Sequence, residues 1–364
     1  MKFSIVRCKF LDGLQKVQNV VSGKGTLQIL QNALIQAKDG RLCITTTDLD
    51  ISERCYVECE VEQSGSTTLP VRRLSSIIRE LDEGKIMVEV NGDDVATVQA
   101  GSSYFKIIGM SVRDFPPVPS PEGKFCYRID QGVLREMLRK TSYAVSQDET
   151  RRVLNGVLMA FKDNKLTMVA TDGRRLALVE HEIEFSPEAE TEMVLPTKAV
   201  SELTRILDSE GDLKVYAQKN QAVFELGTTM LSSKLIDGVY PNYRQVIPSA
   251  CDERVVIERE ALLSALRRVS VVTTDKSNAT RLTFSANQLT ITINTPDVGE
   301  GRDTVPVKYA GKEISIIFNP EYVMDPLKNI DEDEVFFELN DGHSPALLKC
   351  NVPFLYVLMP LRIS

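Results

Sequence analysis

The sequence repeats one set of motifs three times, and this repeat constrains the fold more than any other feature. A KDGRL turn at 38–42 and a TTD segment at 46–48 return as KDNKL at 162–166 and ATD at 170–172. A fainter third copy ends in TPD at 295–297. The Asp residues of these segments are about 125 residues apart, a spacing typical of domains and too long for solenoid repeats. The repeat predicts three similar domains, and it favours a protein that uses its shape over one with a single catalytic pocket.

Prolines mark the expected domain boundaries. With 364 residues, the chain is long enough for two or three domains, and the repeat selects three. Segment 115–121 contains four prolines and should be stiff and extended, and segment 247–252 follows the second repeat in the same way. We therefore expect domains at 1–120, 121–250 and 251–364.

Short segments with alternating apolar and polar residues, such as 51–61 and 334–339, predict β-strands. Tight turns such as Asp39-Gly40 and Asp341-Gly342 join neighbouring strands, which favours antiparallel sheets. Amphipathic segments predict two helices in each repeat. These helices are expected near 10–20, 71–81, 132–144, 197–207, 259–272 and 321–329.

The net charge of −8 argues against nucleic acid only if the charges are evenly spread. Affinity for a polyanion depends on where the basic groups lie, because local contacts to phosphates provide the attraction. Basic residues such as Arg72, Arg73 and Lys198 recur on most predicted helices, while acidic residues concentrate in strands and turns. The bias is not uniform, since Glu136 and Glu202 lie among the basic residues. For any one Arg or Lys a solvated side chain is the simpler interpretation, and only the recurrence favours a basic surface.

The composition leaves little material for a metal site or a histidine-based catalytic site. The chain has two histidines, and its seven cysteines contain no C-x-x-C pair, which is typical of reduced thiols. No motif indicates a cofactor, and no apolar run reaches the roughly 18–20 residues that span a bilayer. The N-terminal segment predicts a strand and lacks the apolar stretch of a signal peptide. We expect a cytoplasmic protein without metal, cofactor or membrane partner.

The segment TDGRRL at 171–176 ends a predicted strand and has two interpretations. It could bind a phosphate or a peptide, or it could form a hairpin turn with solvated arginines, and it lacks the spacing of a P-loop. The nearby group of Asp148, Glu149, Arg151 and Arg152 could serve acid–base chemistry, but a solvated loop is the stronger interpretation.

The C-terminal segment is strongly apolar. Tyr356–Leu358 is expected to be a last core strand. Met359–Ile363 contains a strand-breaking proline and is expected to form a partly exposed apolar surface, which usually marks a partner site.

Together with the three-fold repeat, the segments at 171–176, 240–244 and 359–362 resemble those of the bacterial DNA polymerase III β subunit family, the sliding clamps. The resemblance covers the whole chain. It implies an α+β clamp fold of three similar domains, each with two helices packed on antiparallel sheets. It also implies a homodimeric ring of two head-to-tail chains that encircles double-stranded DNA regardless of sequence. Such a ring confers processivity on the replicative polymerase and has no catalytic site of its own.

The resemblance also implies functional residues. The DNA-binding positions correspond here to Lys24, Arg72, Arg151 and Lys198. The ring interface corresponds to Phe105 and Ile107 on one chain and to Val271 and Val272 on the other. The partner-peptide cleft, between the second and third domains, corresponds to Leu154, Thr171, Gly173, Arg174, Arg175, Leu176, Pro241, Gln245, Val246, Val357, Met359, Pro360, Leu361 and Arg362.

The implied partners are the clamp loader, the DNA polymerase III α subunit and other proteins with a clamp-binding motif. Two further hypotheses come from other classes of protein. One is a phosphotransferase or hydrolase that uses Asp172 and the neighbouring arginines, although the chain has no nucleotide loop or nucleophile motif. The other is a β-rich scaffold that binds peptides without encircling DNA. Salt-dependent retention on circular but not on linear DNA would distinguish the clamp from both.

Overall fold

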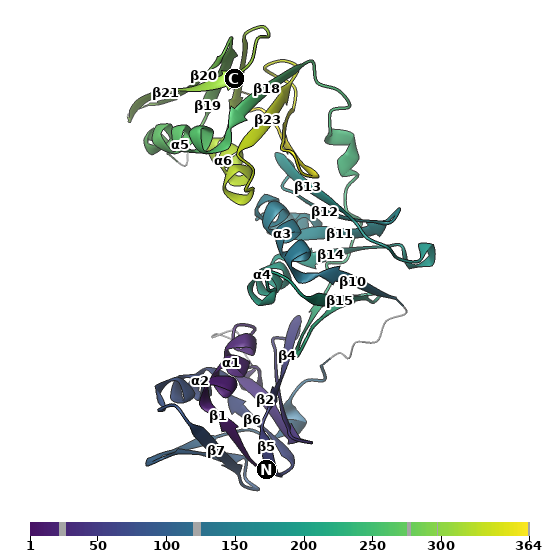
Figure 1. The fold of residues 1–364 in the computed structure, drawn as a ribbon, viewed down its shortest axis with the longest axis vertical. Helices are drawn as coiled ribbons and strands as arrows, with labels where there is room; N and C mark the ends of the chain where they lie inside the picture. Colours follow the sequence, from purple (N-terminus) through teal and green to yellow (C-terminus); the bar gives the residue numbers. More distant parts are fainter. Residues whose placement is uncertain (22–26, 119–124, 275–277, 297, 363–364) are drawn as a thin grey trace. The chain divides into compact units, whose positions relative to one another are not determined.

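The structure is a computed structural model that describes residues 1–21, 27–118, 125–274, 278–296 and 298–362 (Figure 1). It contains helices together with antiparallel sheets, in agreement with the expected α+β class. The six expected helices are present near their predicted positions. They are α1 (Arg7–Val17), α2 (Val71–Glu80), α3 (Gln131–Thr141), α4 (Thr197–Ile206), α5 (Arg259–Val269) and α6 (Pro320–Asn329).

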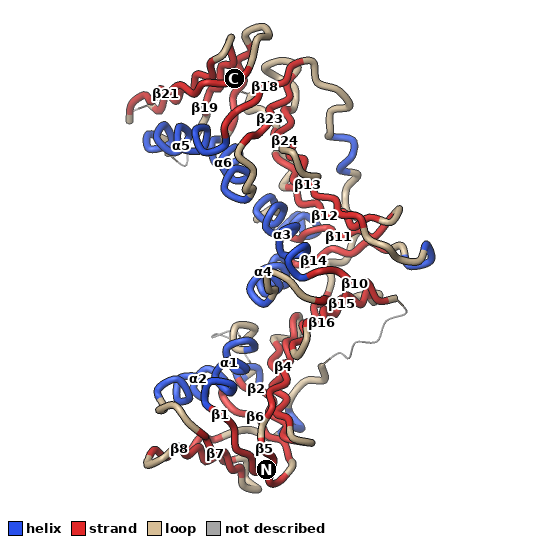
Figure 2. The backbone as a smooth tube through the Cα atoms, in the orientation of Figure 1, coloured by secondary structure: helices blue, strands red, loops and turns tan. Residues whose placement is uncertain are grey.

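The chain divides into two compact units, and the first contains residues 1–135 and 201–235. Two antiparallel sheets form this unit within the described residues (Figure 2). The smaller sheet has the strand order β5 (Glu60–Gln63), β1 (Lys2–Val6), β7 (Lys85–Val90), β8 (Val95–Ala100) and β9 (Ser103–Ile108). The larger sheet has the order β10 (Cys126–Asp130), β15 (Asp212–Ala217), β16 (Gln221–Leu226), β17 (Thr229–Lys234), β4 (Ile51–Glu58), β3 (Arg41–Thr47), β2 (Asn32–Lys38) and β6 (Gly65–Pro70).

The second unit contains residues 136–200 and 236–364. Its described strands form one antiparallel sheet with the order β14 (Thr191–Pro196), β11 (Gly156–Lys162), β12 (Lys165–Thr171), β13 (Arg175–Glu182), β25 (Phe354–Leu358), β24 (Ala346–Lys349), β23 (Glu334–Leu339), β18 (Glu253–Glu258), β21 (Gly299–Lys308), β20 (Gln288–Thr295), β19 (Thr280–Ser285) and β22 (Ile314–Phe318). Both large sheets cross a repeat boundary, since β17 pairs with β4 and β25 with β13. The division into units therefore falls inside the expected second domain, and the boundaries at 120 and 250 stay our proposal.

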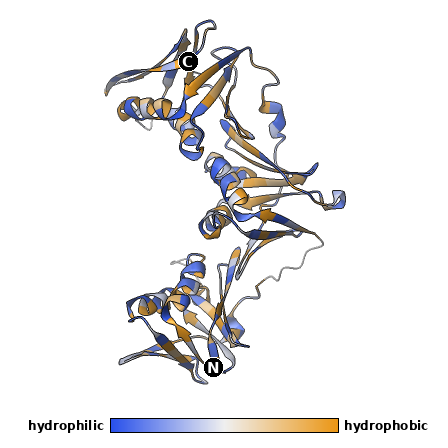
Figure 3. Cartoon of the chain, in the orientation of Figure 1, coloured by the Kyte–Doolittle hydropathy of each residue, from blue (hydrophilic) through white to orange (hydrophobic). Residues whose placement is uncertain are grey.

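Apolar residues three and four positions apart hold the helices against the sheets. On α1, Phe10, Leu14 and Val17 are fully buried. On α2, Leu74 and Ile78 are fully buried in the same core. Each such side chain stabilises the fold by about 1.5–3 kcal/mol relative to an exposed one. Figure 3 shows hydrophobic and hydrophilic stretches on the same helices, as expected for amphipathic segments.

The repeated Thr-Asp motif forms the same turn in the first two repeats. The Oδ1 atoms of Asp48 and Asp172 each accept hydrogen bonds from the backbone N–H groups two and three residues ahead, at 2.8–3.0 Å. The residue after each Asp has a positive φ, 80° at Leu49 and 85° at Gly173. Glycine adopts this conformation without strain, whereas leucine does not. The motif thus repeats because it builds a turn, and its Asp side chains are engaged by backbone.

The two sheet junctions share one backbone pattern. At the end of β17, the Lys234 N–H donates to the Asp50 carbonyl at 2.8 Å. After β25, the Met359 N–H donates to the Arg174 carbonyl at 2.9 Å. Asp50 and Arg174 each follow the Thr of the repeated motif by three residues. The repeat therefore extends from sequence to individual backbone hydrogen bonds.

A second set of equivalent bonds lies two residues further along and occurs in all three repeats. Its N–H donors and carbonyl acceptors are Met110 and Thr68 (3.1 Å), Ile236 and Val194 (2.9 Å), and Leu361 and Ile317 (2.8 Å). Counting back two residues makes Ile108 the equivalent of Lys234 and Met359.

A buried contact between a carboxyl group and a guanidinium links the first two repeats within the first unit. Glu53 on β4 is fully buried, and its carboxylate lies 3.1 Å from the Arg205 guanidinium of α4. Burial raises the pKa of Glu53 to about 8, and the attraction of Arg205 opposes this effect only in part. Arg205 is shared with Glu202 at 2.8 Å, so its charge is divided between two carboxylates.

We expect the stability of this link to fall as the pH rises. Between the unfolded pKa near 4.5 and the folded pKa of about 8, folded Glu53 holds a proton that the unfolded chain releases. The free energy of unfolding should therefore decrease between pH 5.5 and pH 8.5 by on the order of 3 kcal/mol relative to Glu53→Gln, which cannot titrate. Urea unfolding at pH 5.5 and 8.5 measures the difference. Parallel pH profiles for the two proteins would contradict it.

Candidate functional site

A row of buried residues crosses the sheet of the second unit where β24, β25, β13 and β12 lie side by side. The pairing register places Val357 opposite both Leu347 on β24 and Leu176 on β13. Thr171 on β12 lies opposite Leu176. Directly paired residues of antiparallel strands share a face of the sheet, so these four residues form one continuous surface, the cleft row. It joins three of the predicted cleft residues, while Leu347 was not predicted.

Residues from outside these strands pack against the cleft row. Leu154, which precedes β11, and Tyr240, which follows β17, belong to the same hydrophobic cluster as Leu176 and Val357. The Tyr240 hydroxyl donates to the carbonyl of Val169 at 3.4 Å, and burial raises the pKa of this hydroxyl. The predicted residue Leu154 therefore lies with the row despite its distance in sequence.

The segment that follows Tyr240 supplies exposed residues. Pro241 and Gln245 are exposed, and Val246 exposes 44% of its surface. Tyr243 in the same segment packs against the hydrophobic cluster. The structure thus places these three predicted residues at the surface of a segment that two tyrosines anchor beside the row.

The C-terminal residues continue from β25 past the end of the cleft row. The backbone bonds of Met359 and Leu361 described above hold this tail in place. Met359 exposes 38% of its surface, Pro360 and Leu361 are half-buried, and Arg362 is exposed. Ile363 lies outside the described residues. An exposed methionine on a fixed backbone is suited to an adaptable contact with a partner.

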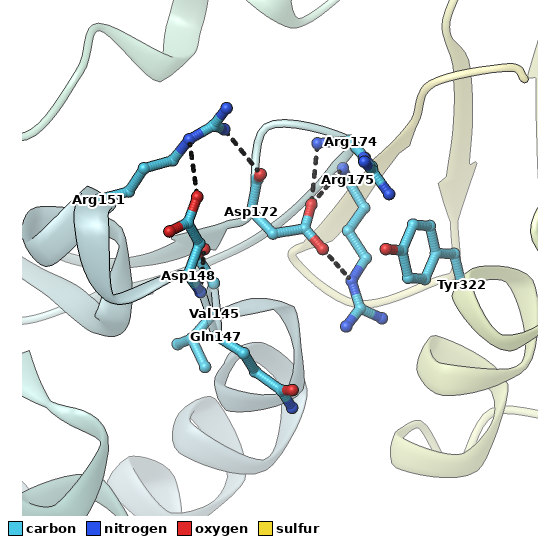
Figure 4. A pocket seen from close by; sticks show the side chains of 9 residues that line it. Val145, Gln147, Asp148, Arg151, Asp172, Arg174, Arg175 and Tyr322 are labelled. Atoms are coloured by element: carbon cyan, nitrogen blue, oxygen red, sulfur yellow. Dashed lines mark hydrogen bonds and ion pairs between the residues drawn. The ribbon is translucent and has the colours of Figure 1, made fainter. Parts of the chain in front are cut away.

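Arg175 forms the best-connected charged group of the site (Figure 4). Its guanidinium pairs with Asp172 at 3.1 Å and with Asp325, and donates to the Tyr143 carbonyl at 2.6 Å. It also lies 4.3 Å from the centroid of the Tyr322 ring. With 10% of its side chain exposed, Arg175 is not solvated, so that interpretation of the turn is wrong for this residue. Its main role here is to connect β13 with α6.

A pocket of about 380 Å³ lies beside this network (Figure 4). Arg151 and Arg174 line it together with Asp148 and Asp172. The Arg151 guanidinium lies 3.6 Å from the Asp148 carboxylate. Because the two side chains are 57% and 50% exposed, this ion pair is weak. Asp148 also accepts the Thr150 N–H at 3.0 Å, as the cap of a short helical turn. The acidic residue proposed for acid–base chemistry thus shapes the loop.

Strand β9 forms an open edge, because within the described residues it pairs only with β8. Tyr104, Phe105 and Ile108 on this strand expose 55%, 38% and 77% of their surfaces. The predicted Ile107 is 3% exposed and belongs to the core of the first unit. Ile108, the most exposed of the group, is not among the residues that the family resemblance implies. Exposed apolar residues on an open edge are typical of a strand that pairs with another chain.

A second open edge lies on β21. Gly299–Pro306 pair with β20, but on the other side only Val307 and Lys308 pair with β18 among the described residues. Near this edge Val271 exposes 81% of its surface and Val298 54%, while Val272 is half-buried.

Comparison with known proteins decides the family. Models of the DNA polymerase III β subunit match the chain in three parts: the N-terminal domain at 1–119, the central domain at 128–242 and the C-terminal domain at 244–362. The chain belongs to the DNA polymerase III β subunit family. The β sliding clamps of Chlamydia muridarum and Pseudomonas putida are 35% and 33% identical to it over the whole chain, covering 99% and 100% of those relatives. A sliding clamp crystal structure from Pseudomonas aeruginosa, bound to griselimycin, is 33% identical, with a TM-score of 0.96 over the whole of both chains.

Members of this sliding clamp family form dimeric rings and act as processivity factors of DNA polymerase III. The chain is therefore a sliding clamp and not an enzyme, which excludes the hypothesis of catalysis at Asp172. Among the described residues no group of three His, Cys, Asp or Glu is placed to hold a metal ion, and no helix is long and apolar enough to cross a membrane. All seven cysteines are free thiols.

Two of the four residues that the family resemblance implies for DNA binding lie on helices. Arg72 on α2 and Lys198 on α4 are exposed, and the Arg72 guanidinium donates to the Val21 carbonyl at 2.7 Å. Arg151 lies in the pocket beside the Arg175 network. Lys24 lies outside the described residues.

The helices carry a narrower basic surface than the sequence predicted. Arg139 and Lys140 pair with Glu136 at 2.8 and 2.9 Å, and Arg268 pairs with Asp303 at 2.7 Å. These pairs neutralise much of the charge on α3 and α5. On the helices, the exposed basic residues for which the described part of the chain shows no ion pair are Lys16, Arg72, Arg73, Arg79, Arg135 and Arg267.

Proposed function

We propose that two copies of this chain pair head to tail through β9 of one copy and the open half of β21 of the other, and that the closed ring slides along duplex DNA. The repeated sheet junction is the observation that carries this proposal. β17 joins β4, and β25 joins β13, with equivalent backbone bonds. The first repeat offers an open edge on β9 and the third repeat offers one on β21, and joining these edges in two copies gives a two-fold closed ring.

The repeat also gives the register of this seam. Ile108 is the equivalent of Lys234 and Met359, and Val298 follows the motif Thr as Asp50 and Arg174 do. The Ile108 N–H would accordingly donate to the Val298 carbonyl of the second copy. Pairing would remove these two exposed apolar residues from water, which favours association.

Counting back along the antiparallel strands gives the next pairs. Lys106 would lie opposite Glu300 of the second copy, so that opposite charges meet across the seam. Phe105 would lie opposite Gly301, where a side-chain carbon would be 3.3 Å from Cγ2 of Val272. The Phe105 ring would therefore reach Val272, and this contact unites two of the interface residues that the family resemblance implies.

We infer that the cleft row, with Leu154 and the exposed Val246 and Met359 around it, accepts short peptide segments of partner proteins. The clamp loader and the DNA polymerase III α subunit are the partners of this kind. The supporting observation is an apolar floor bordered by exposed apolar side chains on a fixed backbone. Such a groove binds a few apolar anchors and discriminates by shape.

Deleting Met359–Ser364 should abolish peptide binding and leave the dimer intact. The deletion removes the exposed Met359 and the backbone that borders the row, and we expect affinity for a labelled peptide from the clamp-binding segment of the α subunit to fall at least 100-fold. Fluorescence anisotropy measures the affinity, and sedimentation the mass.

The single substitution Met359→Asp should lower peptide affinity roughly tenfold in the same assay. Met87→Asp is the matched control, because Met87 is 40% exposed on β7 of the other unit. This variant should bind the peptide as tightly as wild type. Unchanged peptide affinity in the deletion variant would place the binding site elsewhere.

The DNA proposal is tested by comparing loaded rings on circular and linear DNA. A topological link should keep the ring on circular DNA at salt concentrations that weaken phosphate contacts, whereas the ring should slide off linear DNA. The double variant Arg72→Ala/Lys198→Ala should weaken direct DNA binding roughly tenfold and flatten its salt dependence, while retention on circles persists. Lys219→Ala, at an exposed turn, is the control. Equal release from circular and linear DNA would favour the peptide-binding scaffold instead.

A further inference from the structure

A second row of side chains runs beside the cleft row on the same sheet face. Leu355 on β25 pairs with both Lys349 on β24 and Leu178 on β13. Each of these residues is two positions along its strand from a member of the cleft row, so all point to the same face. Leu355 and Leu178 are half-buried, whereas the corresponding Val357 and Leu176 are buried. The apolar floor therefore continues beyond the cleft row and becomes more accessible.

A pocket of about 360 Å³ lies over this second row. Val352, Pro353 and Phe354 at the start of β25 line it, and so do Arg244 and Ile247 of the segment that follows Tyr240. Tyr243 and Ile247 of the same connecting segment also pack against the cluster that contains the cleft row. One segment thus borders both the cleft and this second pocket, and the two sites share one apolar face.

The charges around the pocket leave one cation available. Lys349 pairs with Glu338 at 2.6 Å, and Glu180 lies 3.4 Å from Lys165. The exposed Arg244 has its guanidinium 5.8 Å from the Tyr243 ring centroid, and no carboxylate of the described residues forms an ion pair with it. Glu180 and Asp163 attract Arg244 only at longer range, so a ligand carboxylate would find an arginine without a direct ion pair among the described residues at the rim of an apolar pocket.

We propose that this pocket holds residues of the partner segment just outside the part that binds in the cleft, with an apolar side chain on the second row and a neighbouring Asp or Glu at Arg244. This proposal rests on the cleft proposed above. Adjacent positions on one strand face are about 6.7 Å apart, so a few additional residues bridge the two sites. Partners with such an extension would bind more tightly than partners without it.

The test uses one α-subunit clamp-binding peptide and four extended forms of it. The extension, Gly-Gly-Leu-Asp or Gly-Gly-Leu-Lys, is added at the N-terminus or at the C-terminus, because either end of the peptide bound in the cleft could lie next to the second pocket. At one of the two termini, the Leu-Asp extension should make the peptide bind wild-type protein about tenfold more tightly than the unextended peptide. The Leu-Lys extension at the same terminus should increase the affinity less. Arg244→Glu should reverse the preference between Asp and Lys. Val352→Ser should reduce the gain from either extension.

Two controls make the outcomes decisive. The unextended peptide should bind wild type, Arg244→Glu and Val352→Ser equally, and Lys219→Glu should behave as wild type with every peptide. If the unextended peptide binds but neither extension improves affinity, or if Arg244→Glu leaves the Asp preference intact, the second pocket is not a partner site. If the unextended peptide does not bind the wild-type protein, the cleft proposal itself fails.

Discussion

Replacing Lys106 with glutamate is expected to convert the dimer largely to monomers at micromolar concentration. In the register that the repeat gives, residue 106 faces Glu300 of the second copy, so the substitution turns an attraction into a repulsion. Like charges directly opposite each other destabilise paired strands, and a ring of two chains contains the seam twice. We expect the dissociation constant to rise roughly 100-fold, as measured by sedimentation velocity over a dilution series.

The reciprocal substitution makes this prediction specific. Glu300→Lys alone should weaken the dimer to a similar extent, and the double variant Lys106→Glu/Glu300→Lys should recover most of the affinity. A general effect of charge would not recover in this way. Lys219→Glu, with the same charge change at a distant exposed turn, should remain dimeric. A stable dimer in the Lys106→Glu variant would show that the two edges do not meet in this register.

Arg175→Ala is expected to be the most damaging single substitution at the site. It leaves the carboxylates of Asp172 and Asp325, which are 13% and 22% exposed, without their shared cation. Removing one partner of a buried ion pair costs on the order of 3–5 kcal/mol, and the contact with Tyr322 is lost as well. Thermal and urea unfolding should show the loss.

The neighbouring Arg174→Ala provides the comparison, because Arg174 is exposed and the substitution should change stability by no more than about 0.5 kcal/mol. Combining Arg175→Ala with Asp325→Asn should cost less than the sum of the two separate effects, since each removes the same interaction. Equal losses in Arg174→Ala and Arg175→Ala would contradict the network seen in the structure.

Local patterns predicted most secondary structure, because alternation and amphipathicity report directly on which side chains are buried. Strand β23 begins and ends at its predicted residues, 334 and 339. The predicted strand at 51–61 instead divides into β4 and β5, since β4 pairs with β3 and β17 whereas β5 pairs with β1. Strand partners are far apart in sequence, so this division leaves no local signal.

The candidate site was predictable where the family motif is contiguous and not where distant residues meet. The turn at 171–176 was selected from sequence, yet its arginines differ: Arg174 is exposed and Arg175 is enclosed by residues such as Tyr322 and Asp325, about 150 positions away. On β9 the two residues that the resemblance implies differ: Phe105 is exposed, whereas Ile107 belongs to the core of the first unit, and Ile108 on the opposite face is in solvent.

The continuity of each large sheet across a repeat boundary has a mechanical consequence. At the β4–β17 and β13–β25 junctions, the paired strands belong to one polypeptide, so the covalent chain joins the two repeats in addition to the ladder of hydrogen bonds. At the proposed seam between copies, no peptide bond crosses the gap. Tension on the closed ring would therefore concentrate at the two seams. The strands paired there would separate first, while the sheet junctions within each chain remain paired.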